Sequence, residues 1–160
     1  MRIGIISDTH GSLPTAITRA FADVDHIIHA GDIGGQHILD KLELIAPVTA
    51  VYGNCDYFGD YPTTEETACV TLGETRIFVA HTPGLIREAV SGRGDLPVHA
   101  PLPHIGVHGH THVPRNEYAG AVLMLCPGSP VRPREGSLPS VMLLELETGK
   151  SPVATIVPIN

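Results

Sequence analysis

The alternation of short apolar runs with helix-like segments in the first third of the chain limits the possible folds most strongly. Residues 2–6 (RIGII), 26–30 (HIIHA) and 48–52 (VTAVY) are continuous and rich in β-branched residues, which is typical of strands buried on both faces. The helix-like segments 14–21 and 36–45 separate them, and the second ends before a proline. Strand–helix–strand repeats of this kind predict a parallel sheet with crossover helices.

The remainder of the chain has a different pattern. Turn residues between apolar runs predict hairpins within 69–80, 117–126 and 140–159, and a short strand is expected at 104–107 with a helix at 82–92. We expect this half to be mostly antiparallel. The simplest packing of all the segments is one α/β domain over the 160 residues, with mixed parallel and antiparallel sheets in a layered or sandwich-like arrangement.

Composition excludes several classes of protein. The chain has 17 acidic and 10 basic residues, a formal charge of −7, which disfavours binding of a long nucleic acid. It contains no run of about 18 apolar residues, so no membrane span is expected. The N-terminal apolar run is too short for a secretory signal and the three cysteines are too few for a disulfide framework, so we expect a cytoplasmic protein.

Polar side chains that bind metals follow five of the apolar runs. In open α/β sheets, ligands bind beyond the carboxyl ends of the strands, so these side chains are expected to converge. The seven candidates are Asp8, His10, Asp32, Asn54, His81, His110 and His112.

The types of side chain in this set indicate the kind of metal centre. Two carboxylates, one amide and four imidazoles are too many ligands for one tetrahedral zinc ion. They suit two ions of higher coordination number, held roughly 3.5–4 Å apart by a shared carboxylate. Nitrogen and oxygen donors without thiolate favour manganese, iron, cobalt, nickel or zinc over magnesium or calcium.

The order of these motifs resembles that of the calcineurin-like metallophosphoesterase superfamily. The matching motifs are Asp8-Thr-His10, Gly31-Asp32, Gly53-Asn54-Cys-Asp56, His81 and Gly109-His110-Thr-His112, followed by the segment CPGSPVRPR. Within the superfamily the chain looks like the small bacterial and archaeal phosphodiesterase branch. This resemblance implies an α/β/β/α sandwich and a metal-dependent phosphoesterase.

The resemblance also implies a role for each ligand. One divalent ion, with manganese preferred, would be bound by Asp8, His10, Asp32 and His112. A second would be bound by Asp32, Asn54, His81 and His110, with Asp32 as the bridge. A hydroxide between the ions would attack a small phosphorylated substrate, a phosphodiester in preference to a monoester. Asn54 could also donate its amide N–H to the phosphoryl group.

Two cysteines depart from the superfamily pattern. Cys55 stands where many members have a histidine that is proposed to protonate the leaving group, so Cys55 joins Asn54 as a candidate catalytic residue. A thiol is the poorer acid, and we favour a small buried side chain at this position over a reactive thiol. Cys126 stands where the branch usually has asparagine, which weakens any polar role there.

The sequence allows other interpretations of the function and of several residues. The same fold can serve as a non-catalytic protein-interaction scaffold, as in the retromer subunit of the superfamily, and homo-oligomerisation is not decided by the sequence. For His29 and His108 we favour buried structural roles over ligation, and for Asp56 a role in orienting a neighbouring ligand. The loop 91–104 could cover the site, and His26, His37, His99 and His104 are expected on the surface or in loops.

Overall fold

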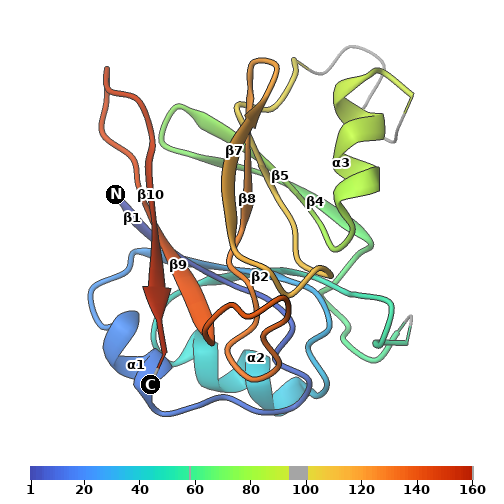
Figure 1. The fold of residues 1–160 in the computed structure, drawn as a ribbon, viewed down its shortest axis with the longest axis vertical. Coiled ribbons are helices and arrows are strands. Elements are labelled where there is room, and N and C mark those ends of the chain that lie inside the picture. Colours follow the sequence, from blue (N-terminus) through green and yellow to red (C-terminus); the bar gives the residue numbers. More distant parts are fainter. Residues whose placement is uncertain (58, 94–100, 160) are drawn as a thin grey trace.

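Two five-stranded sheets pack face to face, with helices on their outer faces (Figure 1). This computed structural model describes residues 1–57, 59–93 and 101–159. Among the described residues, two helices cover the outer face of one sheet and a third covers the other, so the expected α/β/β/α sandwich with mixed sheets is confirmed.

The first sheet is built on the parallel strands predicted from the start of the chain. β1 (Arg2–Ile6), β2 (His26–Ala30) and β3 (Val48–Val51) lie side by side and run in the same direction. α1 (Ala16–Ala20) and α2 (Gln36–Glu43) connect them. The predicted βαβαβ unit is therefore confirmed.

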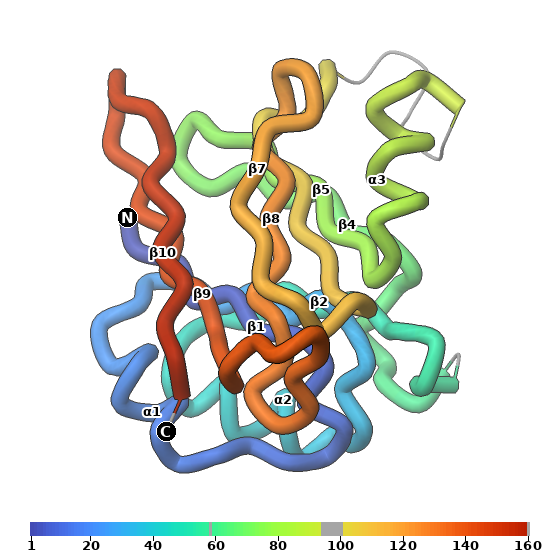
Figure 2. The backbone as a smooth tube through the Cα atoms, in the orientation of Figure 1, coloured from blue at the N-terminus to red at the C-terminus, as the bar shows by residue number. Residues whose placement is uncertain are grey.

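The C-terminal hairpin completes this sheet. β9 (Ser140–Glu145) pairs antiparallel with β1, and β10 (Val153–Pro158) pairs with β9, which gives the order β10-β9-β1-β2-β3. The backbone trace shows the two ends of the chain on the same side of the molecule (Figure 2). The N-terminal ammonium group donates a 2.8 Å hydrogen bond to the carbonyl of Leu146.

The second sheet has the order β4-β5-β6-β8-β7. Its strands are β4 (Thr67–Leu72), β5 (Thr75–Ala80), β6 (Ile105–Val107), β7 (Arg115–Ala119) and β8 (Val122–Cys126). The hairpins β4–β5 and β7–β8 are antiparallel as predicted, but β5–β6 and β6–β8 are parallel. The expectation of a mostly antiparallel second half is thus wrong at the centre of this sheet, because α3 (Pro83–Val90) lies between β5 and β6 as in a crossover connection.

The helices are shorter than predicted. The backbone N–H groups of Ile45 and Ala46 both donate to the carbonyl of Leu42, which tightens the chain before Pro47. α2 therefore ends at Glu43, two residues before its predicted end at residue 45. α1 begins at Ala16, after the expected proline start at residue 14. Within the described residues, no helix has the length and apolar character needed to cross a bilayer.

Three apolar clusters hold the layers together. The first lies between the two sheets and includes Ile5 and Ile28 from the first sheet and Val79 and Val107 from the second. A second cluster packs α1 and α2 against the outer face of the first sheet, and a third packs α3 against the second sheet. Because side chains alternate along each strand, the central strands contribute to an inner and an outer cluster at once.

We predict that Ile28→Ala will destabilise the protein by about 2–5 kcal/mol, because its side chain is fully buried between the sheets and its removal leaves a cavity. Chemical denaturation monitored by circular dichroism measures this change in the free energy of unfolding. Ile156→Ala on the exposed part of β10 is the matched control and should cost less than about 1 kcal/mol. Equal losses in the two variants would contradict the assignment of the inter-sheet cluster to the hydrophobic core.

Candidate metal centre

All seven candidate ligands lie just beyond the carboxyl ends of five strands. Asp8 and His10 follow β1, Asp32 follows β2 and Asn54 follows β3 in the first sheet. The other three come from the second sheet: His81 follows β5, and His110 and His112 follow β6. The centre therefore joins the edges of both sheets.

One group of four ligands is compact. One ligand atom from each of Asp8, His10, Asp32 and His112 lies within 4.8 Å of the others. His112 Nε2 is 3.0 Å from Asp8 Oδ1 and 3.4 Å from His10 Nε2, and His10 Nε2 is 3.8 Å from Asp32 Oδ2. These are the four residues that the family resemblance implies for one ion.

The remaining ligands form a second group around Asn54. Its Oδ1 lies 3.0 Å from His81 Nε2 and 2.8 Å from His110 Nδ1. His81 Nε2 is also 3.4 Å from Asp32 Oδ1. Asn54 and His110 are exposed whereas Asp32 and His81 are buried, so this side of the centre is open to solvent.

The hydrogen bonds of Asp8 leave one carboxylate oxygen free for another ligand. Its Oδ2 accepts bonds from the hydroxyl of Ser7 at 2.7 Å and from the backbone N–H of His110 at 3.1 Å. Oδ1 is buried and has no hydrogen-bond donor. Burial raises the pKa of Asp8 despite the opposing effect of His81 and His112.

Backbone carbonyls fix the orientation of two imidazoles. A carbonyl can only accept, so His81 donates from Nδ1 to Ala30 O at 2.7 Å and His112 donates from Nδ1 to Arg132 O at 2.6 Å. In the neutral rings the Nε2 lone pairs then face carboxylate oxygens. Positive charge between these atoms, from a proton on the imidazole or from a metal ion, would stabilise the contact, and metal-binding histidines commonly donate their other nitrogen in this way. The residues therefore fit a divalent metal site.

Asp32 lies between the two groups of ligands. Burial favours its neutral form, but hydrogen bonds from His81 and from the backbone N–H of Cys55, at 2.8 Å, outweigh this and hold its pKa below the usual range. The same contacts act on His81, where burial lowers the pKa and the two carboxylates raise it, with a net rise.

Asp56 connects the loops that carry Asp32 and Asn54. Its carboxylate accepts hydrogen bonds from the backbone N–H groups of Ile33, Gly34 and Gly53 at 2.8–3.0 Å. The hydroxyl of Tyr61 donates a further bond at 3.1 Å. These contacts support the expected orienting role, because they tie the ends of β2 and β3 together.

The backbone at the centre has an unusual conformation. Outside glycine, positive φ angles occur among the described residues at five of the seven ligands and at Glu135. The five are Asp8, His10, Asp32, His110 and His112, with φ between 43° and 68°. This left-handed conformation is unfavourable for most residues and is typically retained at functional sites.

Glycines make room for the ligands. A Cβ atom at Gly31, where φ is +89°, would lie 2.6 Å from His81 Nδ1. A Cβ atom at Gly53 would collide with Asp32, and one at Gly109 with the hydroxyl of Ser7 that binds Asp8. The glycines of the sequence motifs therefore have a steric function at this site.

The structure corrects the expectation for one cysteine. The side chain of Cys55 is exposed and is not the buried filler that we favoured, because it follows Asn54 on the turn that faces solvent. A hydrogen bond to Asp32 and then burial raise the pKa of its thiol. Cys126 is buried, with Sγ 3.5 Å from the hydroxyl of Thr111.

Sequence reasoning missed two serines that support Asp8. Besides Ser7, the buried hydroxyl of Ser129 donates to the backbone carbonyl of Asp8 at 2.8 Å and accepts from the N–H of Arg132 at 2.9 Å. Ser129 belongs to the Pro-Gly-Ser segment that carried part of the family resemblance, so that motif could have identified it as a residue near the site.

The other histidines have structural surroundings. His29 is fully buried, and its Nε2 bonds to the hydroxyl of Thr9 at 2.9 Å. Thr9 donates to Ile33 O, so its oxygen accepts from His29. The buried ring of His108 bonds to Gly109 O at 3.0 Å. Neither belongs to the compact group of four ligands.

Of the four histidines expected at the surface, His37 and His104 are exposed and His26 is half-buried in β2. His99 and residues 94–100 of the loop that could cover the site lie outside the described part of the chain.

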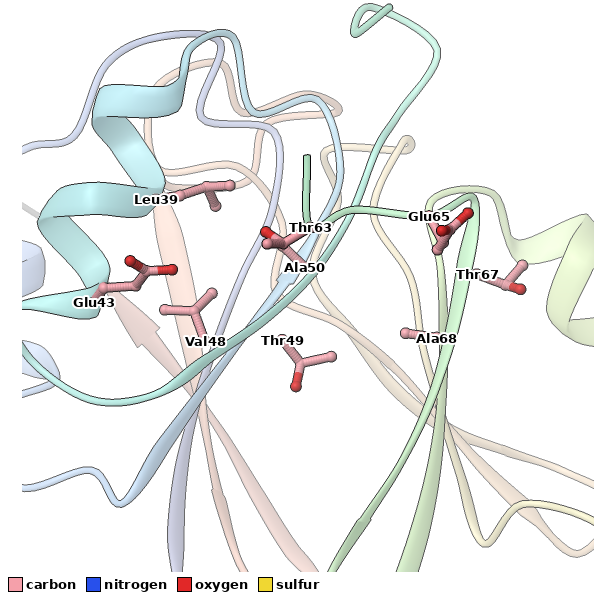
Figure 3. Close-up of a pocket in the computed structure, with 9 residues that line it drawn as sticks. All are labelled: Leu39, Glu43, Val48, Thr49, Ala50, Thr63, Glu65, Thr67 and Ala68. Atoms are coloured by element: carbon pink, nitrogen blue, oxygen red, sulfur yellow. The ribbon is translucent and has the colours of Figure 1, made fainter. Parts of the chain in front are cut away.

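A separate hollow lies between α2, β3 and β4 (Figure 3). It is lined by Leu39, Glu43, Val48, Thr49, Ala50, Thr63, Glu65, Thr67 and Ala68. None of the seven candidate ligands is among these residues, so the hollow is distinct from the metal centre.

Comparison with known proteins agrees with the geometry. The family described as the calcineurin-like phosphoesterase superfamily domain matches residues 1–149. The chain belongs to this superfamily. A probable metallophosphoesterase from Methanothermobacter thermautotrophicus is 38% identical over 164 aligned positions, which cover 94% of this chain and 88% of that protein. Phosphodiesterase YfcE from Escherichia coli K12 is 29% identical, with 91% and 88% covered.

Solved structures show the same fold. The E. coli phosphoesterase YfcE has a TM-score of 0.71 at 27% identity, with all of both chains covered. A Vps29 single mutant from Entamoeba histolytica has a TM-score of 0.75 over all of both chains, and at 23% identity this is a likeness of fold alone. The predictions of the superfamily, its small bacterial and archaeal branch and a metal-dependent phosphoesterase are confirmed.

We predict that Gly31→Ala will weaken Mn²⁺ binding by about 10- to 100-fold, because the new methyl group displaces the ring of His81. Isothermal titration calorimetry measures the affinity. The matched control is Gly120→Ala, which has a similar positive φ of +63° but no atom within 4 Å of the new methyl group. Equal loss of affinity in both variants would show that backbone strain, and not the contact with His81, is responsible.

A second prediction concerns His29, whose pKa burial lowers to about 3. In the unfolded chain its pKa is about 6.5, so the unfolded state binds more protons between these values and stability falls as the pH decreases. From pH 7 to pH 5 the His29→Gln variant should lose about 2 kcal/mol less unfolding free energy than the wild type. Urea denaturation at both pH values measures this, and identical losses would contradict the prediction.

Proposed function

We propose that this protein is a dinuclear metal-dependent phosphodiesterase with Asp32 as the bridging ligand. One ion would be held by Asp8, His10, Asp32 and His112, and the other by Asp32, Asn54, His81 and His110. The position of Asp32 is the main support. Its Oδ2 faces His10 in one group of ligands and its Oδ1 faces His81 in the other, at 3.8 and 3.4 Å.

The two groups of ligands are suited to hold and orient divalent cations. When bound, such ions lower the pKa of a coordinated water toward neutrality and neutralise charge on phosphoryl oxygens. Asp8 and Asp32 supply negative charge from buried positions. The carbonyls of Ala30 and Arg132 keep the Nε2 atoms of His81 and His112 directed into the centre.

Asn54 and Cys55 occupy the open side of the centre, where a substrate would enter. The Oδ1 of Asn54 faces two histidines, and its amide nitrogen lies 3.5 Å from Cys55 Sγ. That N–H group is suited to donate to a phosphoryl oxygen. The raised pKa keeps the thiol of Cys55 protonated at neutral pH. A thiol is a weak acid, so substrates with good leaving groups are favoured.

The substrate class follows from the relatives and from charge. YfcE is named a phosphodiesterase, which supports diesters over monoesters for this chain. The net charge of −7 favours a small phosphorylated molecule over a long nucleic acid. Mixed nitrogen and oxygen ligands support manganese. The scaffold alternative gains little support, because all seven positions carry metal-binding side chains.

The test is metal analysis and hydrolysis with added Mn²⁺. We expect two ions per chain by mass spectrometry and faster hydrolysis of bis(4-nitrophenyl) phosphate than of 4-nitrophenyl phosphate. Asp32→Asn should bind at most one ion and lose at least about 100-fold in kcat. Asp40→Asn, at an exposed position of α2, is the control and should match the wild type. Two ions and full activity in Asp32→Asn would refute the bridging role.

A further inference from the structure

A small pocket opens beside the candidate metal centre. Asn54 and His81, two of the proposed ligands of the second ion, form part of its wall. The rest of the lining includes Tyr52, Thr82 and Leu85. The pocket is therefore continuous with the position where a phosphoryl group would bind.

The size of the pocket limits what it can hold. Its volume is about 250 Å³, below the ~300–1,000 Å³ typical of sites for drug-sized ligands. Tyr52 and Leu85 are half-buried and give it an aromatic and an aliphatic wall. A single ring or a short apolar chain attached to the phosphorus would bury its surface there.

The charge of the pocket indicates which ester group enters it. Glu66 is exposed and lines the pocket together with Tyr52. The leaving oxygen gains negative charge as its bond to phosphorus breaks, and a carboxylate nearby opposes this. The ester group that stays on phosphorus gains no charge, so it is the better occupant. A monoester lacks such a group.

We propose that Tyr52 and Leu85 form a subsite for the retained, uncharged ester group of a phosphodiester. The proposal rests on the phosphodiesterase function proposed above and gives it a structural basis for preferring diesters. It assigns specificity to residues outside the set of seven ligands. The reaction itself is unchanged: water adds to phosphorus and loses a proton, and the P–O bond to the leaving group breaks. The leaving oxygen takes the bonding electron pair and departs as the anion, as 4-nitrophenolate does, or takes up a proton if it is more basic.

The experiment keeps the leaving group constant and varies the retained group. The Mn²⁺-loaded protein is assayed with bis(4-nitrophenyl) phosphate and with methyl 4-nitrophenyl phosphate, which both release 4-nitrophenolate. We expect Leu85→Ala and Tyr52→Ala to lower the ratio of the two kcat/KM values about fivefold, because aryl contact is lost. Leu85→Phe, which fills the pocket without removing apolar surface, should also lower the ratio.

The matched controls are Leu44→Ala and Tyr118→Ala, at exposed positions away from the pocket, and they should keep the wild-type ratio. An unchanged ratio in all three pocket variants would overturn the subsite. So would a fall of the same size in the controls.

A binding measurement separates this proposal from the proposed function. If the wild type hydrolyses neither diester, the phosphodiesterase function is wrong. Calorimetry on the Mn²⁺-loaded protein then compares diphenyl phosphate with dimethyl phosphate. About fivefold weaker binding of the diphenyl ester alone in Leu85→Ala would support the pocket as a binding site for an apolar ester group. Equal effects on both ligands, or no effect, would refute it.

Discussion

The burial of two carboxylates among imidazoles is the constraint on which the rest of this structure depends. Asp8 is fully buried and Asp32 nearly so, and charge in such positions is costly unless it is paired. Backbone and hydroxyl donors form hydrogen bonds with only some of the carboxylate oxygens, since Asp8 Oδ1 has no hydrogen-bond donor. The Nε2 atoms of His81 and His112 face these carboxylates, so a protonated imidazole or a bound cation between them would balance the buried negative charge.

Holding these groups together imposes conditions on the surrounding chain. Five ligands have a left-handed backbone, which costs roughly 1–2 kcal/mol for each residue. Gly31 and Gly53 leave the space that His81 and Asp32 occupy, and Asp56 ties the neighbouring loops together. Strain concentrated at one place in this way is consistent with a site selected for function, because stability alone would favour relaxed turns.

The sequence predicted those parts of the fold and site that depend on local pattern. Apolar runs located the strands, and the candidate ligands after them come together in the structure, because strand ends meet at one edge of a sheet. The parallel pairing of β5 with β6 was missed although the predicted helix between them is typical of a crossover, and the pairing of β6 with β8 was missed because β7 lies between them in the sequence. The exposure of Cys55 depends on how its turn faces solvent, and the pocket beside His81 depends on how α3 packs. Neither feature could be derived from the spacing of residues along the sequence.

The origin of the ligands from both sheets connects metal binding with stability. Asp8 and Asp32 follow strands of the first sheet, whereas His81 and His112 follow strands of the second, and the inter-sheet cluster packs the two sheets together. A cation held by residues of both sheets acts as a cross-link between the layers. Binding to the folded state alone adds its free energy to folding, so the centre and the core stabilise each other. The apolar contacts between the sheets thus help to hold the strand ends that carry the candidate ligands side by side.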